Sequence, residues 1–211
     1  MTRAKRSKHW LQSHARDTYV KQAQQAGYRS RAAYKLIELD RSDRLFKPGM
    51  AVVDLGAAPG GWAQVAAERV GRAGRVIAVD LLVMDPLPGV EVIQGDVTEP
   101  DVLAWIKGRL GPGEADLVIS DMAPNISGRR EVDQANILCL NEMTLEFSQE
   151  VLRAGGGMLV KTFHGEGFDA LREQARRGFR RVTVRKPKAS RSHSSEVYLI
   201  GHERLHENKS N

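Results

Sequence analysis

The stretch Met50-Ala-Val-Val-Asp-Leu-Gly-Ala-Ala-Pro-Gly-Gly-Trp62 decides how this chain folds. Its apolar run from Ala51 to Val53 is typical of a buried strand, and the glycines between Gly56 and Gly61 permit a tight turn. Residues 62–69 are helix formers with an apolar face, so we predict a strand, a turn and a helix. Such a turn points backbone N–H groups and the positive end of a helix at a ligand, and a nucleoside-bearing cofactor is its usual occupant.

The bulk composition is that of one globular domain. The chain has 211 residues, of which 41% are hydrophobic and 27% charged. No apolar run approaches the roughly 20 residues that span a membrane, and the basic N-terminus lacks the apolar segment of a signal peptide. We therefore expect a cytoplasmic protein, a monomer, with no membrane contact. Cys139 is the only cysteine, which excludes an internal disulfide and a cysteine-cluster metal site. We interpret it as a small core residue and predict no metal site.

The net charge of +6 is unevenly distributed. Residues 1–31 hold eight Lys or Arg and one acid, and residues 172–193 hold nine and one, whereas the rest of the chain is acidic. One such cluster can be a solvated face, but two on an otherwise acidic protein favour a polyanionic partner. We predict that both regions contact nucleic acid.

Strands and helices alternate along most of the chain. Residues 1–29 read as a basic, loosely ordered arm, residues 30–203 as the domain and residues 204–211 as a tail. A first helix is expected from Ser30, as N-cap, towards Lys47, and the glycines at 155–157 are expected to end the helix 133–153. The other predicted helices are 62–69, 101–110 and 168–177, and the predicted strands after the first are 75–80, 90–96, 115–121, 158–163, 181–185 and 196–200.

This order predicts an α/β fold. Alternation implies a mostly parallel sheet with helices on both faces and ligands at the carboxyl ends of the strands. The last two strands have no helix between them, which fits an antiparallel edge. The pattern favours the class I S-adenosylmethionine-dependent methyltransferase fold, with a seven-stranded sheet, over a dinucleotide dehydrogenase.

The residues near the strand ends suggest the cofactor. The turn from Gly56 lacks the second glycine of a dinucleotide fingerprint, and no lysine follows it as in a phosphate loop. Asp80, 24 residues after Gly56, can accept hydrogen bonds from a ribose, and Asp96 can receive an adenine amino group, although either can also be a turn acid. Trp62 can line the cofactor or pack on the sheet. One ribose acid and one adenine acid fit S-adenosylmethionine.

Four segments carry a family resemblance, and they are Asp54–Trp62, Ser120–Asn125, Leu159–Phe163 and Ser192–Tyr198. Their sequences resemble the motifs of the FtsJ family of ribose 2′-O-methyltransferases, over about residues 30–200. The resemblance implies a catalytic tetrad of Lys35, Asp121, Lys161 and Glu196, and cofactor contacts at Gly60, Trp62, Asp80, Asp96 and Asp121. Within the family it is similar to bacterial enzymes that modify a uridine of large-subunit ribosomal RNA, so this RNA, in the assembled subunit, is the implied substrate.

Elementary chemistry supports the assignment of Lys161. A lysine in an apolar strand needs carboxylate neighbours, which Asp121 and Glu196 can supply. A free lysine, with a pKa near ~10.4, is rarely neutral at pH 7, so Lys161 either accepts the hydroxyl proton after its pKa is lowered or stays charged and orients the hydroxyl. His164 and His193 are alternative bases, which we interpret instead as phosphate contacts or exposed residues.

Other functions remain open from the sequence alone. Methylation of a base amino group favours a different loop from Asp121-Met-Ala-Pro-Asn125, and base C5 methylation needs a nucleophilic cysteine, for which Cys139 is poorly placed. A ribose methyltransferase for transfer RNA or an mRNA cap could use the same tetrad. A non-catalytic RNA-binding factor for ribosome assembly is the alternative from another class.

Overall fold

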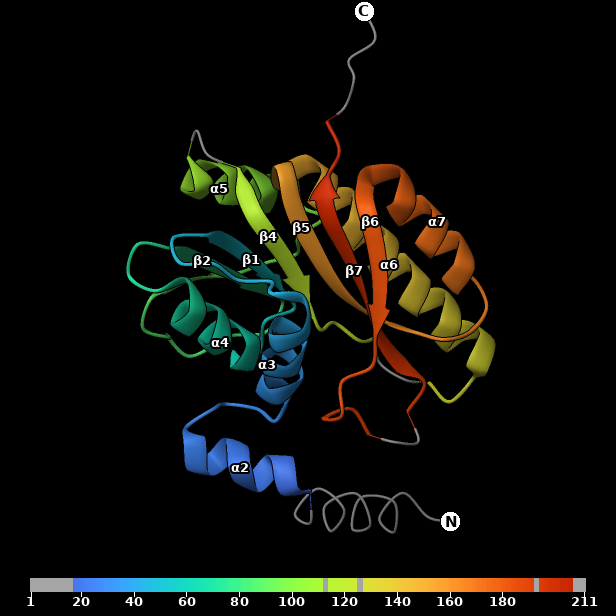
Figure 1. The fold of residues 1–211 in the computed structure, drawn as a ribbon, viewed down its shortest axis with the longest axis horizontal. Coiled ribbons are helices and arrows are strands. Elements are labelled where there is room, and N and C mark those ends of the chain that lie inside the picture. The colour runs from blue at the N-terminus through green and yellow to red at the C-terminus, as the bar shows by residue number, and fades with distance from the viewer. Residues whose placement is uncertain (1–16, 112–113, 125–126, 192–193, 207–211) are drawn as a thin grey trace, which may run out of the picture.

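The computed structural model describes residues 17–111, 114–124, 127–191 and 194–206 (Figure 1). The strands are β1 (Ala51–Leu55), β2 (Arg75–Asp80), β3 (Val90–Gln94), β4 (Ala115–Ser120), β5 (Leu152–Phe163), β6 (Phe179–Arg185) and β7 (Glu196–Arg204). The helices are α2 (Thr18–Ala26), α3 (Ala32–Asp43), α4 (Gly61–Val70), α5 (Pro100–Leu110), α6 (Arg130–Val151) and α7 (Phe168–Gly178). None of the helices in these ranges is long and apolar enough to cross a membrane.

The seven strands form one sheet in the order β3-β2-β1-β4-β5-β7-β6. The first five strands are parallel, and β7 is antiparallel to both of its neighbours. The predicted fold class, with its antiparallel edge, is therefore confirmed.

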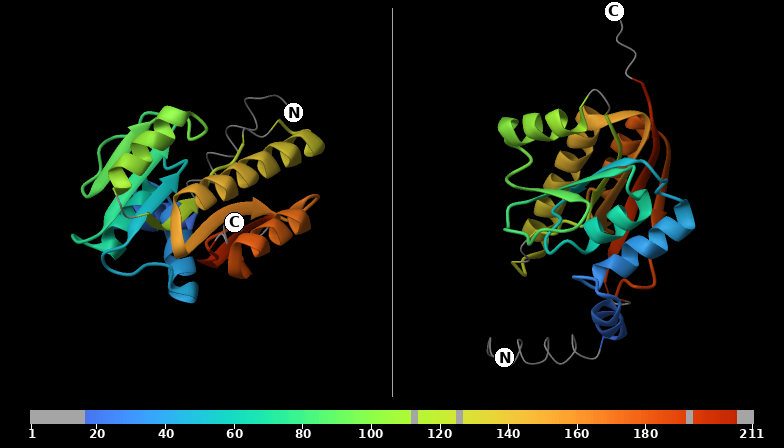
Figure 2. Two further views of the ribbon diagram at one scale, coloured as in Figure 1. Left: turned by 90° about the horizontal axis from the view of Figure 1, so that it is seen from above. Right: turned by 90° about the vertical axis from the view of Figure 1, so that its left-hand side faces the viewer.

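Alternation along the strands separates the core into two layers. Val52 packs with α3 and α4 on one face, whereas Val53 packs with α5, α6 and α7 on the other. Figure 2 shows the helices on both sides of the sheet. The two faces are covered because a mostly parallel sheet exposes apolar side chains on each.

The carboxyl ends of the parallel strands meet at one edge of the sheet. The residues that follow β1, β2, β3 and β4 therefore lie along this edge, as the sequence predicted. Strand β7 also begins there, because it runs antiparallel and pairs Glu196 with Phe163 at the end of β5. The topology thus places the first of the four motifs, which begins at the end of β1, and the last, which ends in β7, at the same edge of the sheet.

The glycines at 155–157 do not end a helix. Helix α6 stops at Val151, and the glycines lie inside β5, where Gly157 pairs with Leu117. A Cβ atom at Gly156 would lie 2.9 Å from the carbonyl oxygen of Arg153 and 3.2 Å from that of Asp116. Glycine is therefore required there for close backbone packing at an irregular point of the β4–β5 pairing.

Helix α2 lies within the region that we expected to be loosely ordered. Asp17 caps it by accepting a hydrogen bond from the Tyr19 amide, and the Tyr19 ring lies 5.6 Å from that of Tyr34 in α3. Aromatic packing between α2 and α3 thus accounts for this ordered segment. Residues 1–16 lie outside the described ranges.

Helix α3 is shorter than predicted. It runs from Ala32 to Asp43, and its N-cap position is Arg31 rather than Ser30. Ser30 instead packs on Gly61, where an added Cβ would lie 2.2 Å from the serine Oγ. This close approach lets the start of α3 pack directly against the start of α4.

Candidate functional site

Lys161 lies at the carboxyl end of β5 and is only 7% exposed. Its Nζ is 3.1 Å from Asp121 Oδ1 and also donates a hydrogen bond to the backbone carbonyl of Asp121. The predicted pairing of a buried lysine with a carboxylate is present, since Asp121 directly follows the adjacent strand β4.

Lys35 reaches the same place from helix α3. Its Nζ is 2.7 Å from Glu196 Oε1 and 4.0 Å from Asp121 Oδ1, and all three side chains are mostly buried. The four residues of the predicted tetrad therefore form one cluster of two ammonium and two carboxylate groups. Their contacts agree with the tetrad, while their catalytic roles remain predictions.

Tyr198 is a fifth member of this cluster, which we did not single out from the sequence. Its hydroxyl lies 2.8 Å from Asp121 Oδ1 and 3.1 Å from Glu196 Oε1, and can donate to either carboxylate. Burial and these two carboxylates raise the pKa of the phenol well above its ordinary value, so the hydroxyl keeps its proton. The signal was present, because residues two apart in a strand share a face and Glu196 was already a candidate.

The ionisation of Glu196 depends on its partners. Burial by itself raises the pKa of the carboxyl, but the Lys35 ammonium and the hydrogen bond from Ser190 Oγ outweigh it and hold the pKa below its usual value. Glu196 is therefore a carboxylate near neutral pH, and it anchors Lys35 beside Asp121.

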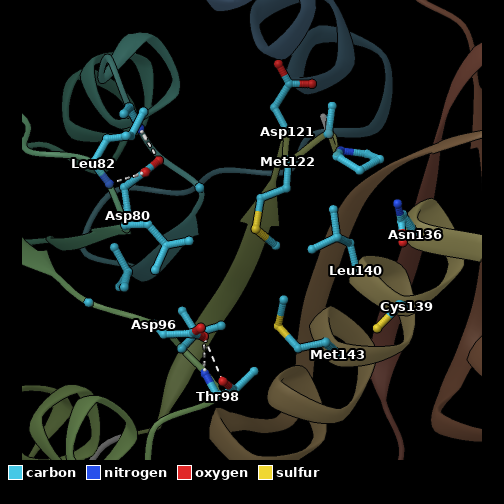
Figure 3. Close-up of a pocket in the computed structure, with 18 residues that line it drawn as sticks. Asp80, Leu82, Asp96, Thr98, Asp121, Met122, Asn136, Cys139, Leu140 and Met143 are labelled. Atoms are coloured by element: carbon cyan, nitrogen blue, oxygen red, sulfur yellow. Dashed lines mark hydrogen bonds between the residues drawn. The ribbon is translucent and has the colours of Figure 1, made fainter. Parts of the chain in front are cut away.

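A cavity of about 740 Å³ adjoins the cluster (Figure 3). Asp121 lines it and so joins the cavity to the lysines. The lining also includes Gly56, Asp80 and Asp96, three of the predicted cofactor residues, together with apolar side chains of Leu81, Leu82, Val97, Met122, Leu140 and Met143. A mostly apolar space with a few carboxylates suits a nucleoside with a long substituent.

The two acids on the far side of the cavity are held by backbone groups. Asp80 accepts hydrogen bonds from the amides of Ala58 and Leu82, each at 2.8 Å. Asp96 accepts from the amide and the hydroxyl of Thr98, which lower the pKa of its carboxyl. Both side chains are thereby fixed as oriented acceptors at the strand ends.

Gly60 and Trp62 do not line this cavity. Trp62 is 3% exposed, donates its Nε1–H to the carbonyl of Ala32 at 2.9 Å, and its ring lies 5.8 Å from that of Tyr198. Packing in the core is thus the observed role of Trp62, one of the two that the sequence allowed. Direct cofactor contact by Gly60 or Trp62 remains an untested prediction.

Asp54 is a buried acid whose environment we did not anticipate. It is 1% exposed, and its Oδ2 has no hydrogen-bond partner. Burial, together with the nearby charges of Asp121 and Asp80, raises the pKa of Asp54 well above its ordinary value. This carboxyl, at the end of β1, is therefore most stable when protonated.

Three further predictions concern single side chains near the site. The interpretation of Cys139 as a core residue is wrong, because the thiol is exposed and lines the cavity on α6. His164 is exposed and makes an edge-to-face contact with Phe168, with ring centroids 4.7 Å apart. His193 lies outside the described residues. Across the described ranges, no group of three or more His, Cys, Asp and Glu side chains is arranged to hold a metal ion.

The basic residues of region 172–193 divide between the two edges of the sheet at which the strands begin or end. Lys186, Lys188 and Arg191 lie in the β6–β7 loop, beside the tetrad. Arg176, Arg177, Arg180 and Arg181 lie at the other edge, because β6 begins opposite Arg204 and ends opposite Tyr198 (Figure 1). One continuous basic sequence therefore forms two separate surfaces.

Comparison with known proteins agrees with this geometry. Residues 28–204 match the FtsJ-like methyltransferase family. The chain belongs to this family. It is 56% identical over 201 residues to the ribosomal RNA large subunit methyltransferase E of Azoarcus sp., covering 95% of this chain and 98% of that protein. The protein of the same name from Methylobacillus flagellatus is also 56% identical over 201 residues, with 95% of this chain and 97% of that one covered.

A solved structure extends the similarity to three dimensions. The crystal structure of a ribosomal RNA methyltransferase from Plasmodium falciparum superposes with a TM-score of 0.76 at 32% identity, covering 84% of this chain and 99% of that chain. The resemblance read from the four motifs is thus confirmed at the level of the family and of its methyltransferase activity. A methyltransferase of this family implies a donor of the S-adenosylmethionine type, and the cavity with its carboxylates fits the nucleoside of such a donor.

Proposed function

We propose that this protein methylates the ribose 2′-hydroxyl of a uridine in large-subunit ribosomal RNA, with S-adenosylmethionine as donor and the assembled subunit as substrate. The cluster of Lys35, Asp121, Lys161 and Glu196 at the rim of the cavity carries the proposal. The names of the relatives from Azoarcus sp. and Methylobacillus flagellatus support the choice of RNA.

The cofactor residues act by binding and orientation. When bound, S-adenosylmethionine supplies an electrophilic methyl group on a sulfonium. Asp80 is the acceptor for ribose hydroxyls and Asp96 for the adenine amino group, since both carboxylates line the cavity with their orientation fixed by backbone amides. Asp121 lies between this space and Lys161 and favours a positive charge near the reacting groups.

Lys161 is the residue that meets the acceptor hydroxyl. Transfer to a ribose oxygen is an in-line displacement, in which alignment can supply on the order of 7 to 11 kcal/mol and a positioned base roughly 10² to 10⁴ in rate. The Nζ of Lys161 is fixed by Asp121, so as a charged ammonium it orients the hydroxyl oxygen, and only as the neutral amine would it take up the hydroxyl proton as the new bond forms. Lys35 and Tyr198 keep the carboxylates in place around it.

The basic surfaces are the proposed RNA contacts. Lys186, Lys188 and Arg191 adjoin the tetrad and suit phosphates flanking the modified nucleotide. The N-terminal region 1–31 is included in this proposal because of its charge. Figure 1 shows that α2 and the β6–β7 loop lie at the same end of the molecule.

The decisive experiment follows methyl groups into separated ribosomal particles. The protein is incubated with S-adenosylmethionine labelled in its methyl group and with large subunits, small subunits, naked ribosomal RNA, transfer RNA or capped RNA. We expect label in the large subunit, at a linkage that resists alkali because its 2′-oxygen is methylated. Label in transfer RNA or capped RNA alone would reject the proposed substrate, and label in an alkali-sensitive position would reject ribose methylation.

A further inference from the structure

The loop between β2 and β3 forms one wall of the cofactor cavity. Leu81 and Leu82 line the cavity although they are 65% and 66% exposed, and Val83 is 78% exposed. The segment has no helix or strand between Asp80 and Val90. A wall with such exposed apolar side chains needs contacts from elsewhere to hold its shape.

Arg29 supplies such contacts from the segment before α3. Its Nη1 donates to the carbonyl of Asp85 at 2.7 Å and to that of Pro59 at 3.2 Å, and its Nη2 donates to the carbonyl of Pro86 at 2.7 Å. Two of these carbonyls belong to the β2–β3 loop and one to the glycine turn. The guanidinium therefore joins the two loops that border the cavity, by charge-assisted hydrogen bonds.

Arg29 is itself fixed by the domain. Its backbone N–H donates to Gln64 Oε1 in α4 at 2.8 Å, and Gln64 Nε2 donates back to the carbonyl of Gly27 at 3.0 Å. The backbone of Arg29 is thus anchored to α4, and its guanidinium connects this anchor to the β2–β3 loop.

Gly60 reveals how closely these parts pack. A Cβ at this position would lie 2.6 Å from Leu87 Cδ1 and 3.3 Å from Arg29 Cδ, and the backbone of Gly60 has a φ of +107°. The glycine turn, Arg29 and the buried Leu87 are therefore in direct contact. This also gives Gly60 a role that does not require it to touch the cofactor.

We propose that Arg29 is a positioning residue of the cofactor site, which holds the β2–β3 loop so that Leu81 and Leu82 form the apolar wall for the purine of the donor. The inference rests on the proposed function only in requiring a nucleoside-bearing donor. Arg29 belongs to the basic region 1–31, and phosphate contact is its competing role. Its three hydrogen bonds to backbone carbonyls favour the structural assignment.

The test measures cofactor affinity without RNA. Binding of S-adenosylhomocysteine is measured by calorimetry for the wild type, Arg29→Ala and Arg29→Lys, with Arg41→Ala as an exposed arginine control on α3. We expect Arg29→Ala to weaken binding roughly tenfold, since hydrogen bonds from a charged donor are lost, and Arg29→Lys to lie between. Amide hydrogen exchange over residues 82–89 should accelerate in Arg29→Ala even without cofactor.

The outcomes separate the two assignments. Unchanged affinity and unchanged exchange in both Arg29 variants, with weaker RNA binding, would make Arg29 a phosphate contact and overturn the inference. Failure of the wild type to bind S-adenosylhomocysteine would instead reject the proposed cofactor. If Arg29→Ala does not fold, judged by its melting temperature, Arg29→Lys alone decides, and wild-type affinity in that variant overturns the inference.

Discussion

The carboxylates on the two sides of the cavity are held by different kinds of contact. Asp80 and Asp96 accept hydrogen bonds from nearby backbone amides, mostly two residues away in sequence. Asp121 is instead held by side chains from distant elements, Lys161 and Tyr198, and Glu196 is held by Lys35 of α3 in addition to its near neighbours Ser190 and Tyr198. We call the side of the cavity with Asp80 and Asp96, which faces the methyl donor, the donor side, and the side with Asp121 and Glu196 the acceptor side. The difference suggests that the carboxylates of the donor side are oriented mainly by local backbone amides. The acceptor side is an electrostatic cluster that exists only in the folded chain.

The largest effect is expected at Lys161. Lys161→Ala should lower the rate of methyl transfer by roughly 10² to 10⁴, because the group that meets the hydroxyl is lost. Affinity for S-adenosylhomocysteine should stay near wild type, because Asp80 and Asp96 are unaffected. Single-turnover transfer and calorimetry measure the two properties.

Lys107→Ala is the matched control for this change, since Lys107 is an exposed lysine paired with Glu150 on the α5 side. Transfer at the wild-type rate by Lys161→Ala would remove Lys161 from the mechanism. A loss of cofactor binding of the same size would show that the two sides of the cavity are not separable.

The converse change is on the donor side. Asp80→Ala should weaken S-adenosylhomocysteine binding by about 10- to 100-fold, the range for a hydrogen-bonded charged group, and leave the rate at saturating cofactor nearly unchanged. Asp101→Ala, an exposed acid in α5, serves as control. A fall in kcat with unchanged affinity would contradict the assignment of Asp80 to binding.

The RNA surfaces can be separated by salt dependence. Substituting Lys186, Lys188 and Arg191 with Gln should weaken binding and flatten the dependence of log K on log salt by up to ~0.7 per lost phosphate contact on a single strand. The distal set of Arg176, Arg177, Arg180 and Arg181 should have an effect in the same direction but smaller. Two of its members already pair with Glu173 and Glu203. An unchanged slope for the distal set would restrict the interface to the edge with the tetrad.

Tyr198→Phe tests whether the cluster on the acceptor side acts as a unit. The change removes one hydroxyl shared by Asp121 and Glu196, and we expect about a fivefold lower rate of transfer, the equivalent of ~1 kcal/mol. Cofactor affinity should not change. A wild-type rate would mean that the lysines alone set the positions of the two carboxylates.

The contrast between local and distant contacts also explains which features could be predicted from the sequence. The strands, the parallel sheet and the donor-side acids follow from local patterns, because a strand end is visible in the chain and its next residues stay near it. The contact between Lys35 and Glu196 joins residues 161 positions apart, and no local pattern contains it. That pairing was available only through the family resemblance.

The predictions that were wrong also rested on local patterns. The glycines at 155–157 suggest a helix end locally, but they lie within β5, where the close approach of backbone carbonyls leaves no room for a side chain at Gly156. Cys139 lies among apolar residues in sequence, yet its position on α6 faces the cavity. The helix α2 depends on the packing of Tyr19 on Tyr34. Each case is a tertiary contact that overrides a local preference.

The smallest effect concerns stability as a function of pH. The pKa of Glu196 is lowered on folding, so its contribution is present above the unfolded value near ~4.3 and is lost as pH falls through the folded pKa. The pKa of Asp54 is raised on folding, so stability is lost as pH rises from the unfolded value near ~3.9 through the folded pKa. The two acids therefore give slopes of opposite sign.

Urea unfolding from pH 2 to 8 measures both slopes. Asp54→Asn, which cannot ionise, should remove a loss of stability that develops with rising pH, so its stability relative to wild type should increase towards pH 8. Glu196→Gln should lose more stability at neutral pH than at pH 2, because at neutral pH Lys35 then lacks its charged partner at 2.7 Å. Parallel curves for wild type and Asp54→Asn would mean that Asp54 ionises normally. The buried acid at the end of β1 would then be charged beside Asp121, and the raised pKa that its burial implies would be contradicted.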